Sequence, residues 1–311
     1  MDWLNKYGLH KFGATESVNI IDSSKIQTYQ TCPRQFMFEH ILGWRFDRSR
    51  HDLIFGQAWH LAMEQMLKDY AEDKKYKKVE AAYAKFEELY RKYYTTETDM
   101  DLAPKNPGTA LAMLHEYART YSYDNFGVVH TEASGLTPIS NERFVSFRLD
   151  AVIDLGKDKG LAILEHKTTK YLSSTWQEQW PNKFQINLYS HALEVQFNEP
   201  VYGIIVNGAV FRKSGGEFIR AVMRKSPDMK EFWIGQFNAW FDMIEADLER
   251  MQDSINKPTL EAFPLNGESC TKYNRACPYI DFCRVWANPL HHCEETPIGF
   301  IKEYWDPRRE E

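Results

Sequence analysis

The sequence lacks long apolar runs and any excess of basic residues. No stretch of about 18 apolar residues occurs in the 311-residue chain, so we expect no membrane span or membrane partner. The formal net charge is −6, so nucleic acid would have to be held by local basic patches. The opening MDWLNKYGLHKFG has no apolar core of a secretory signal, which predicts a cytoplasmic protein, or one in the host-cell cytoplasm if a phage encodes it.

Cysteine is scarce, and one common nucleotide-binding motif is missing. Five cysteines without a secretory signal argue against a disulfide framework and for a reducing compartment, where clustered cysteines more often bind metal. No G-x-x-x-x-G-K-S/T loop occurs, so the chain has no helicase motor of its own and any unwinding of DNA would come from a partner.

The apolar content and its spacing predict a mixed α/β fold. Hydrophobic residues make up 43% of the chain, enough for a large core. Up to residue 125 the chain reads as mostly helical: Ser23 and Ser24 are expected N-caps, Pro33 should begin a short helix through Phe38, and longer helices should cover 54–72, 78–94 and 108–124.

The spacing of apolar residues then changes to that of strands. We expect strands at 128–133, 142–155, 160–169, 201–211 and 217–225, with helices at 182–197 and 228–253. The order predicts a mixed central sheet flanked by helices. It further predicts one domain, 1–311, with a mostly helical part at 22–125, a sheet core at 126–225, and a long helix with a cysteine-rich segment at 226–311.

Charged residues interrupt the apolar strand ILEHK. Glu165 and Lys167 are two positions apart and therefore share one face of that strand. Asp150 lies in the preceding strand across a GKDKG turn, so it is expected to face Glu165, with Asp154 as the rival. Two carboxylates suit Mg²⁺, and a lysine beside them could assist hydrolysis of a phosphodiester. The alternative is an ion pair at the rim of the sheet.

Four motifs in order resemble the PD-(D/E)xK nuclease superfamily. They are G-QAW-H at 56–60, Asp150, E-H-K at 165–167 and Q-INL-Y at 185–189. The match is nearest to the RecB-like branch, which includes CRISPR adaptation nucleases and AddB-type nuclease domains, and SSKIQTYQTCPRQFMFEHILG resembles the start of that branch. Two departures are Phe147, where the family often has glycine, and the missing proline of the PD pair.

The resemblance, over about residues 22–286, implies a restriction-endonuclease-like core that uses Mg²⁺ or Mn²⁺ to cut DNA. It implies His60, Asp150, Glu165 and Lys167 as the catalytic set. It implies His60, Glu132, Asp150 and Glu165 as metal ligands, and Gln185 and Tyr189 as residues that contact DNA or support the site.

Four cysteines are divided between the two parts of the chain. Cys270, Cys277 and Cys283 lie close together in sequence, whereas Cys32 is more than two hundred residues away. Four thiolates can hold Zn²⁺ or a 4Fe–4S cluster, and the lack of C-x-x-C pairs disfavours zinc. The resemblance implies the cluster, because similar nucleases carry one N-terminal and three C-terminal cysteines around it. The alternative is four buried thiols, and Cys293 is expected to be an ordinary thiol.

Several side chains are candidates for contact with DNA. Tyr171, Trp176 and Trp180 follow the E-H-K strand and could stack on unpaired bases, although such residues more often belong to a core. Candidate phosphate contacts are Arg34, Arg45, Arg48, Arg50, Lys170, Lys183, Arg212 and Lys213.

The leading hypothesis is a metal-dependent DNA exonuclease with an iron–sulfur cluster, acting in repair, recombination or phage-type DNA processing. Its expected partners are DNA with a free or single-stranded end and a helicase or recombination protein. The alternatives are a non-catalytic DNA-binding scaffold subunit of the same fold and an iron–sulfur redox protein.

Overall fold

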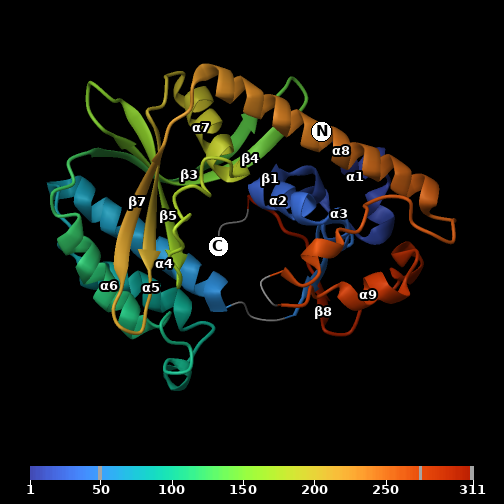
Figure 1. Ribbon diagram of the computed structural model, residues 1–311, viewed down its shortest axis with the longest axis horizontal. Helices are drawn as coiled ribbons and strands as arrows, with labels where there is room; N and C mark the ends of the chain where they lie inside the picture. Colours follow the sequence, from blue (N-terminus) through green and yellow to red (C-terminus); the bar gives the residue numbers. More distant parts are fainter. Residues whose placement is uncertain (48–50, 273–274, 309–311) are drawn as a thin grey trace. The chain divides into compact units, whose positions relative to one another are not determined.

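The computed structural model describes residues 1–47, 51–272 and 275–308, and Figure 1 shows their helices and strands. The chain forms two compact units from interleaved segments. The central unit comprises Ser49–Ser134 and Arg148–Ser226, and the terminal unit comprises Met1–Arg48, Gly135–Phe147 and Pro227–Glu311. The division predicted from sequence, at residues 125 and 225, differs from these units because it cuts the chain into contiguous segments. That residues 1–311 form a single domain stays a prediction.

The central unit is built on a mixed sheet. Its strands follow the order β4 (Phe144–Asp154), β5 (Leu161–Thr169), β6 (Gly203–Val210) and β7 (Glu217–Met223), and β3 (Gly127–Pro138) also pairs with β4. β5 and β6 are parallel and are connected through helix α7 (Phe184–Phe197), while β4–β5 and β6–β7 are antiparallel. The predicted mixed sheet flanked by helices is confirmed.

Three helices cover one face of this sheet: α4 (His51–Asp73), α5 (Val79–Tyr90) and α6 (Pro107–Thr120) (Figure 1). Their apolar side chains form one core with residues of β4, β5 and β6. Phe55 and Trp59 of α4 both meet Phe211 edge to face, with ring centroids 4.9 and 5.1 Å apart. Burial of each such ring stabilises the fold by about 1.5–3 kcal/mol, which fixes α4 against the sheet.

The segment between β5 and α7 packs its tryptophans inward. A Cβ atom added at Gly208 of β6 would lie only 2.5 Å from the ring of Trp176, so only glycine leaves room for that ring. Trp176 and Trp180 are buried, with ring centroids 5.3 Å apart. They belong to the core, which was the alternative to a stacking role, whereas Tyr171 is exposed.

The terminal unit is mainly helical. Helix α2 (Ser23–Thr31) begins after Asp22, whose carboxylate accepts a hydrogen bond from the Lys25 backbone N–H at 2.8 Å. The predicted caps Ser23 and Ser24 are therefore wrong, because both lie inside the helix and the carboxylate one residue earlier satisfies the free N–H. Pro33 begins helix α3 (Pro33–Phe36) as expected, and a short π-helix, η3 (Met37–Ile41), continues it.

The long helix α8 (Pro227–Ser254) and the short helix α9 (Ile280–Val285) also belong to the terminal unit. In this unit β1 (Ile21–Asp22) pairs with residues 145–146 of β4, and β2 (Trp44–Phe46) pairs with β8 (Phe300–Lys302). The other short helices described in this unit are α1 (Trp3–Lys6), η1 (Leu9–Phe12), η2 (Glu16–Asn19), η5 (Gly267–Ser269) and η7 (Pro289–His292), whereas η4 (Thr96–Thr98) belongs to the central unit. Within the described ranges, no helix is both long enough and apolar enough to cross a membrane.

Candidate functional site: a carboxylate centre and a cysteine centre

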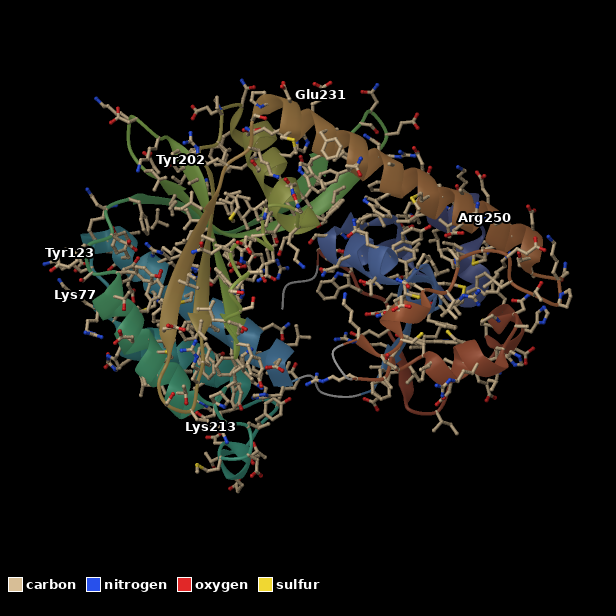
Figure 2. All side chains as sticks on the ribbon, viewed as in Figure 1. Lys77, Tyr123, Tyr202, Lys213, Glu231 and Arg250 are labelled. Carbon is tan, nitrogen blue, oxygen red and sulfur yellow. The ribbon has the colours of Figure 1, made fainter. Side chains whose placement is uncertain are left out.

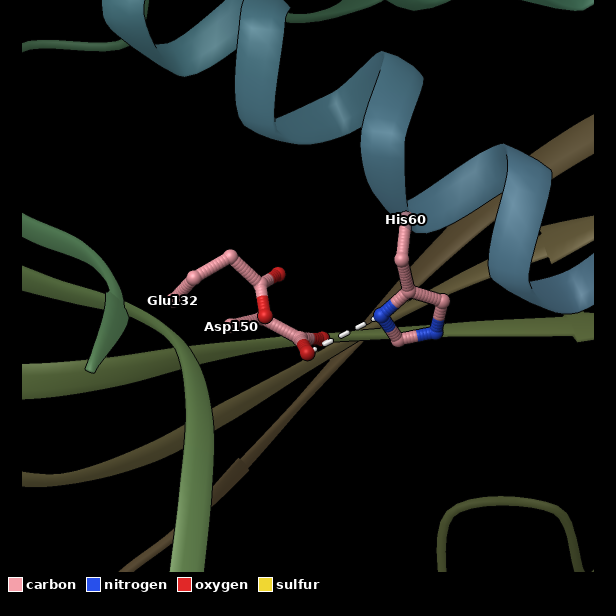
Figure 3. Close-up of side chains that lie close together, drawn as sticks. All are labelled: His60, Glu132 and Asp150. Atoms are coloured by element: carbon pink, nitrogen blue, oxygen red, sulfur yellow. Dashed lines mark hydrogen bonds and ion pairs between the residues drawn. The ribbon is translucent and has the colours of Figure 1, made fainter. Parts of the chain in front are cut away.

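Three side chains from separate elements of the central unit converge in the carboxylate centre (Figure 3). His60 comes from α4, Glu132 from β3 and Asp150 from β4. One potential ligand atom from each lies within 4.8 Å of the others, a geometry that could hold a metal ion. Sequence spacing could not have placed Glu132 here, and only the family resemblance pointed to it.

Both carboxylate oxygens of Asp150 accept hydrogen bonds. Oδ1 lies 2.9 Å from Nδ1 of His60, and Oδ2 accepts the backbone N–H of His166 at 2.6 Å. Burial opposes protonation of His60, but the Asp150 carboxylate outweighs it and raises the pKa of His60 to about 9. Burial likewise opposes ionisation of Asp150, and His60 reverses this, so that the pKa of Asp150 falls to about 2. The two groups form an ion pair at neutral pH.

Glu165 and Lys167 form the second part of the centre. Ala151 pairs with Leu164, and extending this register by one residue places Asp150 opposite Glu165, as predicted. Lys167 Nζ lies 2.6 Å from Glu165 Oε1. Glu165 is only 1% exposed, and its Oε2 has no hydrogen-bond partner among the described residues. Burial, together with the charge of Asp150, raises the pKa of Glu165 to about 7.

The backbone of Glu132 is strained. Its φ of +50° lies in the left-handed region that residues other than glycine rarely adopt, here inside a strand. Such strain is typical of positions where a side chain must be aimed away from the regular pleat. Burial, followed by the charge of Asp150, raises the pKa of Glu132 to about 7. The rival candidate Asp154 lies apart from this group, because its carboxylate accepts the Gly156 backbone N–H at 2.8 Å in the turn before β5.

A buried polar network supports the backbone at His166. Its Nδ1 lies 3.2 Å from the side-chain amide nitrogen of Asn207, and Asn207 Oδ1 accepts Arg220 Nε at 3.3 Å. Arg220 in turn makes two bonds to Asp124, at 2.6 and 2.8 Å. Sequence reasoning missed this network, because its members have no distinctive spacing along the chain. It holds the segment whose N–H orients Asp150.

Two further predicted groups lie in the central unit. On α7, Gln185 Nε2 donates to the hydroxyl of Tyr189 at 2.8 Å, so the Q-x-x-x-Y pair is one hydrogen-bonded unit on a helix face. Lys170 pairs with Asp52 at 3.2 Å, and buried Lys105 reaches the same Asp52 oxygen, also at 3.2 Å. Lys105 was not predicted as a site residue.

All four predicted cysteine ligands belong to the terminal unit. Cys32 is buried at the start of α3, Cys283 lies in α9, and the Cys277 N–H donates to the Cys270 carbonyl at 2.7 Å. Burial raises the pKa of the Cys283 thiol to about 11; nearby Arg34 opposes this, and Cys32, Cys277 and Cys270 add to it. The Cys283 thiol therefore lies within electrostatic reach of the other three thiols, despite its separation from Cys32 in sequence.

Other contacts connect the segments that carry these cysteines. The side-chain amide of Asn266 donates to the Thr31 carbonyl at 2.8 Å, and the Tyr279 hydroxyl donates to the Trp44 carbonyl at 2.6 Å. Arg34, predicted from sequence as a DNA contact, donates through Nε to the Phe263 carbonyl at 2.8 Å. Its guanidinium is thus already used inside the terminal unit.

The other predicted phosphate contacts differ in their surroundings. Arg45 pairs with Glu303 at 2.8 Å and Arg212 pairs with Glu217. Lys183 is the N-cap of α7, and Lys213 is exposed. Arg48 and Arg50 lie outside the described residues.

Comparison with known proteins places this arrangement in context. A family model described as the PD-(D/E)XK nuclease superfamily matches residues 23–284. Among solved structures, the chain is similar to the crystal structure of SSO0001, with 12% sequence identity, a TM-score of 0.27, and coverage of 60% of this chain and 74% of that chain. No curated protein matches it in sequence.

Proposed function

Because the chain belongs to the PD-(D/E)XK nuclease superfamily, we propose that it is a metal-dependent DNA exonuclease of the RecB-like branch that carries a structural 4Fe–4S cluster. The observation that carries the proposal is the carboxylate centre: a His60–Asp150 ion pair beside Glu132, with Glu165 and Lys167 on the adjoining strand. Its proposed setting is DNA repair, recombination or phage-type DNA processing in the cytoplasm.

The donor set fits a hard divalent cation. Buried Glu165 Oε2 lacks a partner among the described residues, which is costly for a carboxylate unless a cation or its water approaches. Oxygen ligands with one imidazole suit Mg²⁺ or Mn²⁺. We assign His60, Glu132, Asp150 and Glu165 as the residues that would hold the ion. When bound, such an ion polarises a phosphoryl oxygen and lowers the pKa of a bound water.

Other side chains would orient the metal ligands, stabilise charge on the phosphate and contact DNA. His60 holds Asp150 in one orientation, and the His166 N–H fixes its second oxygen. Lys167 uses one proton on Glu165, which leaves two N–H groups to orient a water or stabilise the negative charge that develops on phosphate. For DNA contact we propose Lys170 and the Gln185–Tyr189 pair. The bond of Arg34 to the Phe263 carbonyl makes it the weakest of the proposed DNA contacts.

The cysteine centre is proposed to hold a 4Fe–4S cluster through Cys32, Cys270, Cys277 and Cys283, with Zn²⁺ as the alternative. Four thiols suit either metal centre: Cys32 lies at the start of α3, Cys270 and Cys277 precede α9, and Cys283 lies in α9. The role would be structural, because the ligands connect α3 to the segment around α9 and so close a loop of more than two hundred residues. Since no nucleotide-binding loop is present in the sequence, a helicase or recombination partner would supply any unwinding.

Two other functions would use the same fold. A non-catalytic scaffold subunit would bind DNA without cutting it, but it would have no use for Lys167 beside a buried glutamate. An iron–sulfur redox protein would need only the cysteine centre.

Digestion of end-labelled single- and double-stranded DNA by anaerobically purified protein, with and without Mn²⁺, separates these functions. We expect metal-dependent release of short products, and a loss of at least about a thousandfold in Asp150→Ala with DNA binding retained. Glu165→Ala should behave alike, and Asp154→Ala is the matched control, since its carboxylate lies outside the centre. Binding without cleavage by the wild type would favour the scaffold, and normal cleavage by Asp150→Ala would refute the assigned centre.

A further inference from the structure

Tyr171 is a large aromatic side chain displayed just beyond the catalytic strand. It follows β5 by two residues, and 84% of it is exposed. The two tryptophans that come next in the sequence, Trp176 and Trp180, are buried. The exposed ring is free to stack on a ligand with an apolar face, and its surroundings decide whether it has one.

The backbone at Tyr171 is held firmly. The Thr169 hydroxyl donates to the Tyr171 carbonyl at 2.8 Å and also accepts the Tyr171 N–H at 3.1 Å. These reciprocal bonds close a tight turn directly after the strand. The ring is therefore presented from a fixed base, which lowers the entropy lost when something stacks on it.

Positive charge surrounds this turn. Lys170 and Lys105 share one carboxylate oxygen of Asp52, each at 3.2 Å, which leaves a net positive charge there. Lys105 also lies 3.1 Å from the hydroxyl of Thr168. Lys170 and Lys105 thus place two cations beside an exposed ring, and this combination is what single-stranded nucleic acids bind.

We propose that Tyr171 stacks on an unpaired base of a DNA strand whose phosphates pass Lys170, and so makes the enzyme prefer single-stranded ends. This inference rests on the proposed nuclease function. At about 3.3 Å per residue, Tyr171 lies at most roughly 13 Å along the chain from Lys167, close enough for the strand being cut. A base within a duplex is already stacked on both faces, so the ring gains contact only with an unpaired base.

Binding of short fluorescent single-stranded and blunt duplex oligonucleotides tests the proposal. The Asp150→Ala background keeps the DNA intact. Tyr171→Ala should weaken single-strand binding roughly 5- to 100-fold and change duplex binding less than about twofold. Tyr171→Phe should bind as the parent does, because the ring is kept. A 2-aminopurine in the strand should be quenched on binding by the parent and not by Tyr171→Ala.

Tyr123 supplies the matched control. It is 95% exposed, belongs to the same unit, and is labelled in Figure 2. Tyr123→Ala should leave both affinities unchanged. Equal losses on both DNA forms, or no loss in Tyr171→Ala, would overturn the stacking role. If Tyr171→Ala selectively weakens single-strand binding but the wild-type protein never cuts DNA, the nuclease function is refuted and the stacking site stands.

Discussion

The two candidate centres are held together in different ways. In the carboxylate centre, adjacent strands set the positions: the β4–β5 register puts Asp150 opposite Glu165, and the neighbouring His166 N–H fixes Asp150. In the cysteine centre, the ligands sit on short helices and loops, and side-chain bonds to carbonyls, such as those of Asn266 and Arg34, connect the segments. Strand pairing thus positions the carboxylates, whereas hydrogen bonds between short helices and loops position the four cysteines.

Loss of one cysteine should have the largest effect, because a cluster needs all four ligands. We expect Cys32→Ser and Cys277→Ser to lose nearly all bound iron and to melt at clearly lower temperature. Iron content and thermal unfolding of the purified variants measure this. Cys293→Ser is the control, since that thiol already donates to the Pro289 carbonyl at 3.3 Å and should change neither quantity. Full iron in Cys32→Ser would mean that the ends of the chain do not share one centre.

Lys167→Ala should come next. Removal of the ammonium beside Glu165 takes away a charge that stabilises the transition state without removing a proposed metal ligand. Cleavage should slow by about a hundredfold, with iron content unchanged. Single-turnover rates on a labelled strand provide the measurement. A rate within a few-fold of wild type would show that the lysine only forms an ion pair at the rim.

The pH dependence of metal binding should be smaller. Glu132 and Glu165 have pKa values raised to about 7, so both hold protons at pH 6 and release them by pH 8. A cation must displace those protons and also the proton of His60, whose pKa is raised to about 9, so Mn²⁺ affinity should rise about tenfold or more between these pH values. Without metal, the same shift stabilises the fold below the ordinary glutamate pKa, and this contribution is lost as pH rises through 7.

Titration of Mn²⁺ by calorimetry at the two pH values checks this prediction. Asp154→Asn should keep the full pH dependence, because its carboxylate binds a backbone N–H outside the centre. Glu132→Gln should flatten the dependence, since it removes one of the groups that must release a proton to the solvent when the metal binds. A pH-independent affinity in the wild type would contradict the assignment of these carboxylates as ligands.

Local spacing along the chain predicted the sheet and singled out Asp150, Glu165 and Lys167. It did not predict the contacts between distant segments. The sheet and its helices depend on strand periodicity, and the structure confirms them; Asp150 and Glu165 lie one residue beyond the Ala151–Leu164 pair of the antiparallel strands β4 and β5. The approach of His60 could be inferred only from the family pattern. The support of His166 by Asn207 was missed, because it depends on contacts between β5, β6 and β7. The N-cap at Asp22 was missed because Ser23 and Ser24, which follow it, are also common N-cap residues.

The interleaving of the two units has a consequence for biosynthesis. Every residue of the central unit has been synthesised once Ser226 is added, whereas the terminal unit still lacks α8 and three of its four candidate cysteine ligands. At about 5–20 residues per second, a ribosome takes roughly 3–11 s to add residues 227–283, which carry α8 and those three cysteines. The sequence of the central unit is therefore complete before Cys270, Cys277 and Cys283 have been added. A chain cut after residue 226 would therefore hold every residue of the carboxylate centre but only one of the four candidate cysteine ligands.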